Sequence, residues 1–294
     1  MRRVRVGITV GDPAGIGPEI ARKARVDPRV LEVCDPVIFG PTTLDDVRLG
    51  VENAAGGRAA YETIVRAVDA VRSGEVDAIA TGPISKRAFA LAGIPWKGHT
   101  DLLAHLCGVA DVRMLFYADI ARPLCVTLAT VHVPLANVSG LLTVADVSRT
   151  IVMTADWLHH LGVTAPRVAM AGLNPHAGES GLLGSEDEAI LRPAVAEAAR
   201  QGVVASGPWP ADTVFVRAVR GEFDAVVACY HDQGLIPVKL LAFGQAVNVT
   251  IGLPIVRTSV DHGTAFDIAG RGVADHGSLV SAVRLAARLA GARR

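Results

Sequence analysis

The stretch VRVGITVGDPAGIGPE, residues 4–19, indicates how this chain folds. Its first half is a short apolar run in which Val4, Val6, Ile8 and Val10 alternate with other residues, as in a β-strand. Its second half is a turn rich in glycine and proline, which ends the strand. Short apolar strands closed by such turns are typical of α/β proteins when helices separate them along the chain.

The same alternation of short apolar runs and longer helical stretches continues to the C-terminus. Further strands are predicted at residues 37–40, 77–83, 114–118, 124–132, 167–173, 224–231 and 247–253. Apolar residues at helical spacing predict helices over 61–71, 144–158 and 279–290. Strands separated by helices imply β-α-β units, so we expect an α/β fold with a largely parallel sheet.

The composition is that of a globular protein with an aliphatic core. The 294 residues are enough for about two domains. Half of the residues are hydrophobic but only 4% are aromatic, so the core must consist mainly of Ala, Val, Leu and Ile. Lys and Arg together number 29, as do Asp and Glu, so the chain has no general attraction for nucleic-acid phosphates. We therefore expect no nucleic-acid partner.

Cysteine usage and hydropathy predict a cytoplasmic protein. Cys34, Cys107, Cys125 and Cys229 are far apart and form no C-x-x-C motif, which favours reduced thiols. No apolar run approaches the roughly 18 residues of a membrane span, and no signal peptide is evident. We expect no membrane partner.

Three of the predicted strands are followed by a loop that contains a histidine. LATVHVPL places His132, GLNPHAGESG places His176 and CYHDQG places His231. Ligands of open α/β sheets bind beyond the carboxyl ends of the strands. Three neutral imidazoles can hold a divalent metal and leave a position open for substrate. From the residues alone, the histidines either share a metal or each form hydrogen bonds within their own loop.

Other polar residues near strand ends also allow two interpretations. The turn at 11–19 is neither a Walker P-loop nor G-x-G-x-x-G, and it is either an anion cradle or a tight turn. Lys86, Lys239 and Arg257 could bind a phosphate or carboxylate, or be surface charges. KGHTD (97–101) supplies an imidazole and a hydroxyl that suit phosphate.

Two aspartates complete the candidates. Asp212 and Asp232 could act as metal ligands or proton carriers, or as a helix N-cap and a loop hydrogen-bonding group. A Rossmann fingerprint occurs nowhere in the chain, so that motif does not indicate a nicotinamide cofactor.

Taken together, the loops resemble those of a known enzyme family. They resemble, in the same order, those of the 4-hydroxythreonine-4-phosphate dehydrogenase family of vitamin B6 biosynthesis. The resemblance runs from near residue 7 to near residue 285. The segments that carry it are GDPAGIGPEI, TGPISKRAFALAGIPWKGHTD, GLNPHAGESGLLGSED, GPWPADTVF, CYHDQGLIPVKLL and VNVTIGLPIVRTSVDHGTAFDIAGRGVAD. The segment 262–275 also resembles the adenosine-binding loop of isopropylmalate and isocitrate dehydrogenases. Those enzymes oxidise and decarboxylate without a Rossmann fold, which agrees with the missing fingerprint.

The resemblance implies a two-domain architecture like that of isocitrate and isopropylmalate dehydrogenases, with a cleft between the domains. One α/β domain would comprise residues 1–125 and 250–294 and carry both termini and the nucleotide loop. The other would comprise residues 126–249 and carry the metal ligands and the interface of a homodimer. The active sites would lie at this subunit interface.

The resemblance also implies a role for each candidate residue. The metal ligands would be His132, His176 and His231. The substrate contacts would be His99, Thr100, Lys239, Asn248 and Arg257. The nucleotide loop would include His262, Gly263 and Thr264, and the acid–base groups would be Asp212, Asp232 and Lys239.

The implied reaction is oxidation of the 3-hydroxyl of 4-phosphohydroxy-L-threonine by NAD or NADP, followed by decarboxylation. One divalent metal per site, zinc, cobalt or magnesium, would assist; imidazole ligands suit zinc or cobalt, whereas magnesium prefers oxygen. Related alternatives are a 4-phospho-D-threonate or D-erythronate dehydrogenase and a terephthalate dihydrodiol dehydrogenase. A metal-dependent hydrolase or lyase, or a catalytically silent binding protein, would belong to a different class.

One departure from the family pattern bears on the substrate. Between 41–50 and 51–64 the chain is shorter than typical members. Because that region belongs to the substrate side of the first domain, it leaves substrate identity open. Retention of KGHTD, NVTIGLP and VRTSVDHGT favours a phosphorylated substrate over the dihydrodiol.

Overall fold

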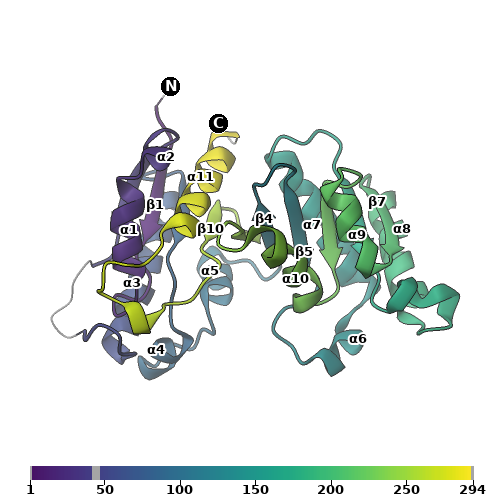
Figure 1. Cartoon of the computed structure of the whole chain (residues 1–294), viewed down its shortest axis with the longest axis horizontal. Helices are drawn as coiled ribbons and strands as arrows, with labels where there is room; N and C mark the ends of the chain where they lie inside the picture. Colours follow the sequence, from purple (N-terminus) through teal and green to yellow (C-terminus); the bar gives the residue numbers. More distant parts are fainter. Residues whose placement is uncertain (1, 42–46, 293–294) are drawn as a thin grey trace. The chain divides into compact units, whose positions relative to one another are not determined.

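The structure, a computed structural model, describes residues 2–41 and 47–292 and divides into two compact units (Figure 1). The first unit runs to Val112 and resumes at Val247, and the second spans Arg113–Ala246. The expected boundary at residues 125 and 126 falls inside a strand of the second unit. Part of the shortened segment, residues 42–46, lies outside the described residues.

The first unit contains a five-stranded part of the sheet with the order β2-β1-β3-β10-β9. Strands β2, β1, β3 and β10 are parallel, and β9 is antiparallel to β10. Its elements are β1 (Arg5–Thr9), α1 (Gly17–Arg25), α2 (Pro28–Leu31), β2 (Asp35–Phe39), α3 (Ala54–Arg72), β3 (Ala78–Thr81), α4 (Lys86–Leu91), α5 (His99–Cys107), β9 (Val247–Ile251), β10 (Arg257–Ser259), η4 (Phe266–Ile268) and α11 (Gly277–Ala292).

The turn from β1 to α1 depends on a very close approach of backbone to backbone. A Cβ atom on Gly17 would lie 1.7 Å from the carbonyl oxygen of Val10, so only glycine fits there. The side chain of Asp12 supports the turn by accepting a hydrogen bond from the Ala14 N–H at 2.9 Å. The tight strand-to-helix turn is thus present, and the anion cradle stays a prediction.

Helices α3 and α11 supply much of the core of the first unit. Aliphatic residues of α3 and α5, with Phe39 and Phe89, form one buried cluster against the sheet. Helix α11 packs on β1, β3 and β10 and lies beside α1 (Figure 1). Helix α11 thus packs beside α1 although the two helices are more than two hundred residues apart in sequence.

The second unit has the strand order β4-β5-β8-β6-β7. Strands β5, β8, β6 and β7 are parallel, and β4 pairs antiparallel with β5. Its elements are β4 (Arg113–Ala118), β5 (Leu124–Leu128), η1 (Leu135–Asn137), α6 (Val138–Leu141), α7 (Val144–His160), β6 (Arg167–Ala171), η2 (Pro175–Gly181), η3 (Asp187–Leu191), α8 (Arg192–Arg200), β7 (Val204–Trp209), α9 (Ala211–Val219), β8 (Ala225–Ala228) and α10 (His231–Ala242).

Helices cover both faces of this second part of the sheet. Val126 and Leu128 of β5 pack in one buried cluster with residues of α9 and α10. Thr127 points to the other face, as strand alternation requires, and its hydroxyl lies 2.8 Å from that of Thr154 on α7. A strand buried on both faces explains why these runs are almost uniformly apolar.

The α/β class and the largely parallel sheet are confirmed, and each strand and helix predicted above is present. The short strands β7 and β10 were not predicted. In the described part of the chain, no single helix is both long and apolar enough to cross a membrane, and the segments 135–141 and 144–160 qualify only as a pair bent by 93°.

Candidate active site

The three predicted metal-binding histidines lie beyond the carboxyl ends of strands, at one edge of the second unit's sheet. His132 follows β5, His231 follows β8 and His176 follows β6. These strands are neighbours in the order β5-β8-β6, and all are parallel. Parallel neighbours present their carboxyl ends together, so the three loops share the edge at which α/β proteins bind ligands.

His132 and His231 meet directly at this edge. Their ring centroids are 5.3 Å apart. Both rings line a pocket of about 250 Å³ together with Asp232, Tyr230 and apolar residues of the 131–138 segment. The pocket therefore presents two imidazoles and a carboxylate against an apolar wall.

Asp232 sets the orientation and the tautomer of His231. The Nδ1 atom of His231 lies 2.7 Å from a carboxylate oxygen of Asp232. In the neutral ring, donation from Nδ1 to the carboxylate leaves the lone pair on Nε2. Metal-binding histidines are commonly held in this way by a carboxylate.

His176 begins a turn with an unusual backbone. The residues from His176 to Ser180 all have positive φ, and four of these five are not glycine. L-residues avoid this left-handed region, at a cost of order 1–3 kcal/mol each where strain persists. The surrounding structure must therefore hold the turn in place.

Two polar side chains, Asp187 buried and Gln233 half-buried, provide that support. Asp187 is fully buried and accepts hydrogen bonds from the backbone N–H groups of Leu173 and Asn174, at 2.9 and 3.1 Å. Gln233 donates to the Gly172 carbonyl oxygen at 2.7 Å and accepts from the N–H group of Cys229 at 2.6 Å. Gln233 thus ties the ends of β6 and β8, and hence the loops of His176 and His231, to each other.

Sequence reasoning missed both supporting residues. Gln233 lies inside CYHDQG and Asp187 ends GLNPHAGESGLLGSED, so the motifs contained them without indicating their roles. Their amide and carboxylate groups bond to backbone far along the chain, and only the fold reveals those partners.

The described residues of a single chain supply part of the ligand set that a metal ion needs. Within residues 2–41 and 47–292, no three His, Cys, Asp or Glu side chains come together as a metal site. Two imidazoles do meet, one with an Nε2 lone pair, and neutral imidazole suits nitrogen-preferring divalent ions. His176 shares the edge but does not line the pocket.

The other two acid–base candidates are not in this pocket. Asp212 lies exposed in the first turn of α9, after β7, the strand next to β6. Lys239 lies on α10 two turns beyond His231, which places it roughly 12 Å further along the helix axis. Of the three predicted acid–base residues, the structure brings only Asp232 to the histidine pair.

In the first unit, Arg257 carries a buried positive charge. It is 2% exposed, and its guanidinium donates hydrogen bonds to the hydroxyls of Thr81 and Thr250 at 2.8 Å. Among the described residues no carboxylate pairs with it, and burial lowers the pKa of the guanidinium to about 9. A buried cation with only neutral partners is costly, and an anion bound beside it would offset that cost.

Two of the other predicted substrate contacts have unpaired buried atoms. The Nε2 atom of His99, at the start of α5, and the Oδ1 atom of Asn248, on β9, are buried and have no hydrogen-bond partner among the described residues. Burial and the nearby charge of Arg257 lower the pKa of His99 well below its usual value, so the ring is neutral. Thr100 follows His99 in the first turn of α5, half-buried.

The predicted nucleotide loop packs against the first glycine-rich turn. The N–H group of Ile16 donates to the carbonyl oxygen of Thr264 at 2.9 Å. A Cβ atom on Gly15 would lie 2.6 Å from the same oxygen, so the contact requires glycine. His262 donates through Nδ1 to the neighbouring Gly263 carbonyl oxygen, and its Nε2 atom is buried with no partner in the part of the chain that the structure describes.

Asp12 is a further buried acid that the sequence did not single out. It is 1% exposed, and its Oδ2 atom has no hydrogen-bond partner within residues 2–41 and 47–292. Burial and the nearby charge of Glu52 raise its pKa, while the hydrogen bond from Ala14 opposes them. Its position in the first glycine-rich turn was visible, but its burial was not.

Known proteins share this sequence and fold. The family model described as pyridoxal phosphate biosynthetic protein PdxA matches residues 18–286. A 4-hydroxythreonine-4-phosphate dehydrogenase of Desulforapulum autotrophicum is 43% identical over 96% of this chain and 94% of its own length. A D-threonate 4-phosphate dehydrogenase of Cupriavidus necator is 40% identical over 97% of both chains.

A solved structure agrees over the whole chain. The 4-hydroxythreonine-4-phosphate dehydrogenase of Klebsiella pneumoniae is 38% identical, covers 98% of each chain and gives a TM-score of 0.87. These likenesses define an α/β dehydrogenase. The chain belongs to the PdxA family.

Proposed function

We propose that this protein oxidises the 3-hydroxyl of 4-phosphohydroxy-L-threonine, or of a close phosphorylated hydroxy acid, with NAD or NADP as hydride acceptor. The resulting β-keto acid then loses its carboxylate as carbon dioxide. The observation that carries the proposal is Arg257, a buried cation whose only partners in the described chain are hydroxyls. The names of the relatives, both 4-phosphate dehydrogenases, agree with an anionic phosphorylated substrate.

The anionic end of the substrate would be bound by polar groups of the first unit. Arg257 supplies the positive charge, and the unpaired atoms of His99 and Asn248 supply a hydrogen-bond donor or acceptor. Neutral His99 can donate through one ring nitrogen, whichever tautomer it adopts. Thr100 adds a hydroxyl, and we include Lys239 as a second cation for the substrate.

The hydroxyl end of the substrate would meet the histidine edge. We propose that His132, His176 and His231 hold one divalent metal ion, for which zinc or cobalt suits the imidazole donors and magnesium is the alternative. Such an ion, when bound, lowers the pKa of a coordinated alcohol and stabilises an enolate. Asp232 keeps the His231 lone pair directed outward and is the best-placed proton acceptor; Asp212 and Lys239 are the others.

Nucleotide binding is assigned to the loop that contains His262, Gly263 and Thr264. The buried Nε2 atom of His262 is a hydrogen-bond acceptor with no partner among the residues described, and an adenine amino group would satisfy it. The Thr264 carbonyl oxygen is already engaged by Ile16, which fixes the loop against the first turn.

We propose a homodimer in which a second copy completes the metal site. Helix α10 begins at His231 and exposes apolar side chains over its length: Ile236 is 66% exposed, Leu240 82%, and Phe243, just after the helix, 80%. Large apolar side chains gathered on one exposed helix are typical of an interface. A second copy on this surface would lie next to a histidine pair that has no third ligand among the described residues of one chain.

The second candidate substrate is 4-phospho-D-threonate or D-erythronate. The 40% identity to a D-threonate 4-phosphate dehydrogenase supports it nearly as well as the identity to 4-hydroxythreonine-4-phosphate dehydrogenases supports the first.

The four cysteines are free thiols, which supports a reducing, cytoplasmic location.

The test is a substrate comparison with metal-supplemented protein. We expect 4-phosphohydroxy-L-threonine with NAD or NADP to give reduced nicotinamide and carbon dioxide, and we would compare 4-phospho-D-threonate, 4-phospho-D-erythronate and terephthalate dihydrodiol. Chelator-treated protein is the control. Product without nucleotide would indicate a hydrolase or lyase, and ligand binding without turnover would indicate a silent binding protein.

A further inference from the structure

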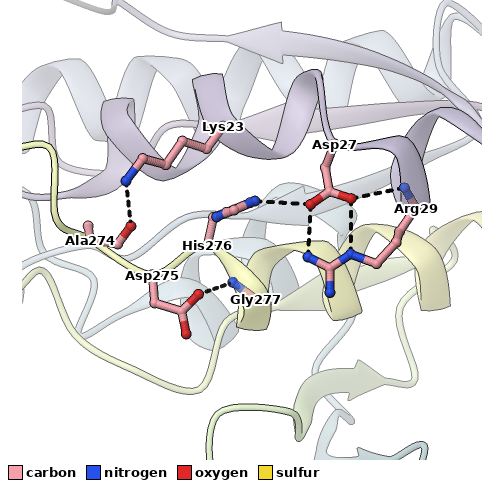
Figure 2. Close-up of polar contacts among 7 residues, drawn as sticks. All are labelled: Lys23, Asp27, Arg29, Ala274, Asp275, His276 and Gly277. Carbon is pink, nitrogen blue, oxygen red and sulfur yellow. Dashed lines mark hydrogen bonds and ion pairs between the residues drawn. The ribbon is translucent and has the colours of Figure 1, made fainter.

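The C-terminal part of the 262–275 segment is fixed to the first helices of its unit by two groups of polar contacts. Figure 2 shows Lys23 reaching the Ala274 carbonyl oxygen and His276 reaching the Asp27 carboxylate. All these residues belong to the first unit. None of them is among the site residues assigned above.

Glu19 and Lys23 grip the backbone of this segment from one face of α1. Glu19 accepts hydrogen bonds from the N–H groups of Ala274 at 2.8 Å and Gly272 at 3.2 Å. Lys23 donates to the carbonyl oxygens of Gly272 at 2.9 Å and Ala274 at 2.8 Å. Glu19 and Lys23 thus bind the N–H and carbonyl groups of both Gly272 and Ala274. We call this pair of side chains the Glu19–Lys23 clamp.

The clamp is internally paired as well. Lys23 Nζ lies 2.8 Å from a Glu19 carboxylate oxygen, and the two residues are one helical turn apart. Burial alone would raise the pKa of Glu19, but the hydrogen bonds from Lys23 and Ala274 outweigh it and lower the pKa. Glu19 is therefore charged at neutral pH, and charge-assisted hydrogen bonds are the strong ones.

A second contact fixes the residue that follows the segment. His276 Nε2 lies 3.0 Å from a carboxylate oxygen of Asp27, which also holds the Arg29 side chain and backbone N–H (Figure 2). Asp275 accepts a hydrogen bond from the Gly277 N–H at 2.9 Å, at the start of α11. The segment is thus held at Gly272 and Ala274 and again at His276.

The Ile16 N–H group holds the Thr264 end of the segment, but residues 270–273 have little apart from the clamp to order them. Gly270 and Gly272 have positive φ, and Val273 is 66% exposed. A stretch with few buried apolar contacts and two glycines would sample many conformations by itself. The hydrogen bonds that Glu19 and Lys23 form with the backbone are the alternative source of order.

We propose that Glu19 and Lys23 are positioning residues for the nicotinamide nucleotide: they hold residues 262–275 in the conformation that receives it, without touching it. This inference rests on the proposed function, because the nucleotide assignment of that segment does. A loop ordered in advance binds without a further loss of conformational entropy, so loosening it weakens nucleotide binding. It leaves the histidine edge and Arg257 unchanged.

The test uses Lys23→Met, which keeps the aliphatic stem, and Glu19→Gln, which keeps the shape. We expect each to raise KM for the nucleotide about tenfold or more, as loss of a charge-assisted hydrogen bond implies. The kcat at saturating nucleotide and KM for the phosphorylated substrate should change less than about twofold. ADP-ribose should bind correspondingly more weakly by calorimetry, and amide exchange at Gly272 and Ala274 should accelerate.

Arg25→Met is the matched control, because Arg25 is an exposed cation in the last turn of the same helix. Lys23→Arg keeps the charge and several donors and should recover part of the affinity. The inference would be overturned if Lys23→Met kept the wild-type KM for the nucleotide, or if kcat and both KM values worsened equally. In either case the wild-type protein would still catalyse the proposed reaction. Wild-type protein that reduces neither NAD nor NADP would instead overturn the proposed function.

Discussion

The charge of Arg257 lies in an interior where its partners in the described chain are threonine hydroxyls. Such a residue contributes little to folding, because removing a charge from water costs several kcal/mol and the hydroxyls return only part of it. Its burial is better explained by an anion that binds beside it. Affinity for substrate, more than stability, should therefore respond to its replacement.

Arg257→Met tests this expectation. We expect KM for the phosphorylated substrate to rise about tenfold to a hundredfold, as loss of a charge-assisted hydrogen bond implies, with nucleotide KM nearly unchanged. The free energy of unfolding, measured in urea, should change by less than about 1 kcal/mol or increase. Arg220→Met, at an exposed cation, is the control. An unchanged substrate KM would remove Arg257 from the binding site.

His176→Ala tests the third metal ligand. Metal content and turnover should both collapse, whereas the circular dichroism spectrum should stay that of the wild type, because the exposed imidazole packs against no core. His160→Ala removes an exposed histidine of α7 and should change neither quantity. Full metal content in His176→Ala would show that the ligand assignment is wrong.

At this scale the sequence predicted residue types better than their environments. His132, His176 and His231 were visible because each follows an apolar run, and strand order then placed their loops at one edge. Whether Arg257 is a surface charge or a buried cation could not be decided, since a three-residue strand carries no periodicity. Its burial depends on Thr81 and Thr250, which only the sheet brings near it.

Among the elements, α1 and the start of α2 contain two carboxyl groups that make the stability of the fold sensitive to acid. Hydrogen bonding with Arg29, against the effect of burial, holds the pKa of Asp27 well below its ordinary 3.8, and the pKa of Glu19 also lies below its ordinary 4.5. A carboxyl with a depressed pKa in the folded state stabilises the fold above its unfolded pKa, and that contribution disappears as pH falls.

We therefore expect the free energy of unfolding to decrease below about pH 4.5, by on the order of 1 kcal/mol for each carboxyl. The free energy of unfolding, measured in urea between about pH 6 and pH 3, gives the slope of stability against pH. Asp27→Asn should lower stability at neutral pH and flatten the part of the slope below about pH 4. If Asp27→Asn has the wild-type dependence of stability on pH, then Asp27 does not cause the loss of stability in acid.

The elements themselves were largely predictable, because buried strands and amphipathic helices have distinct apolar periods. The failures are physical too. Strand β7 (Val204–Trp209) contains a glycine and a proline and is only partly buried, so it lacks an apolar run. The left-handed turn at His176–Ser180 could not be expected from its residues, since four of five are types that avoid that backbone region.

For the whole molecule, the apolar surface of α10 predicts the oligomeric state. The double variant Leu240→Glu, Phe243→Glu would place two charges on that surface and should make the protein a monomer with little turnover. Val204→Glu, at an exposed apolar residue of β7, should stay dimeric. Sedimentation and activity measured together check this. A fully active monomer would refute the shared metal site.

The division into two units could not be derived from composition, because no linker rich in serine or charge separates them. The resemblance supplied it, and the structure gives the limits Val112 and Val247. The difference from the expected boundary has a simple cause: β4 and β5 form an antiparallel pair over their whole length, and a compact unit keeps both strands.

The discontinuous course of the first unit has a consequence during synthesis. Strand β10 pairs with β3, yet the ribosome makes it only after all of Arg113–Ala246. Until β10 and α11 emerge, the edge of β3 has no neighbour on that side, and we expect the inserted unit to become protease-resistant first. Limited digestion of ribosome-bound nascent chains ending near Ala246 would show this order, and a protected N-terminal fragment would contradict it.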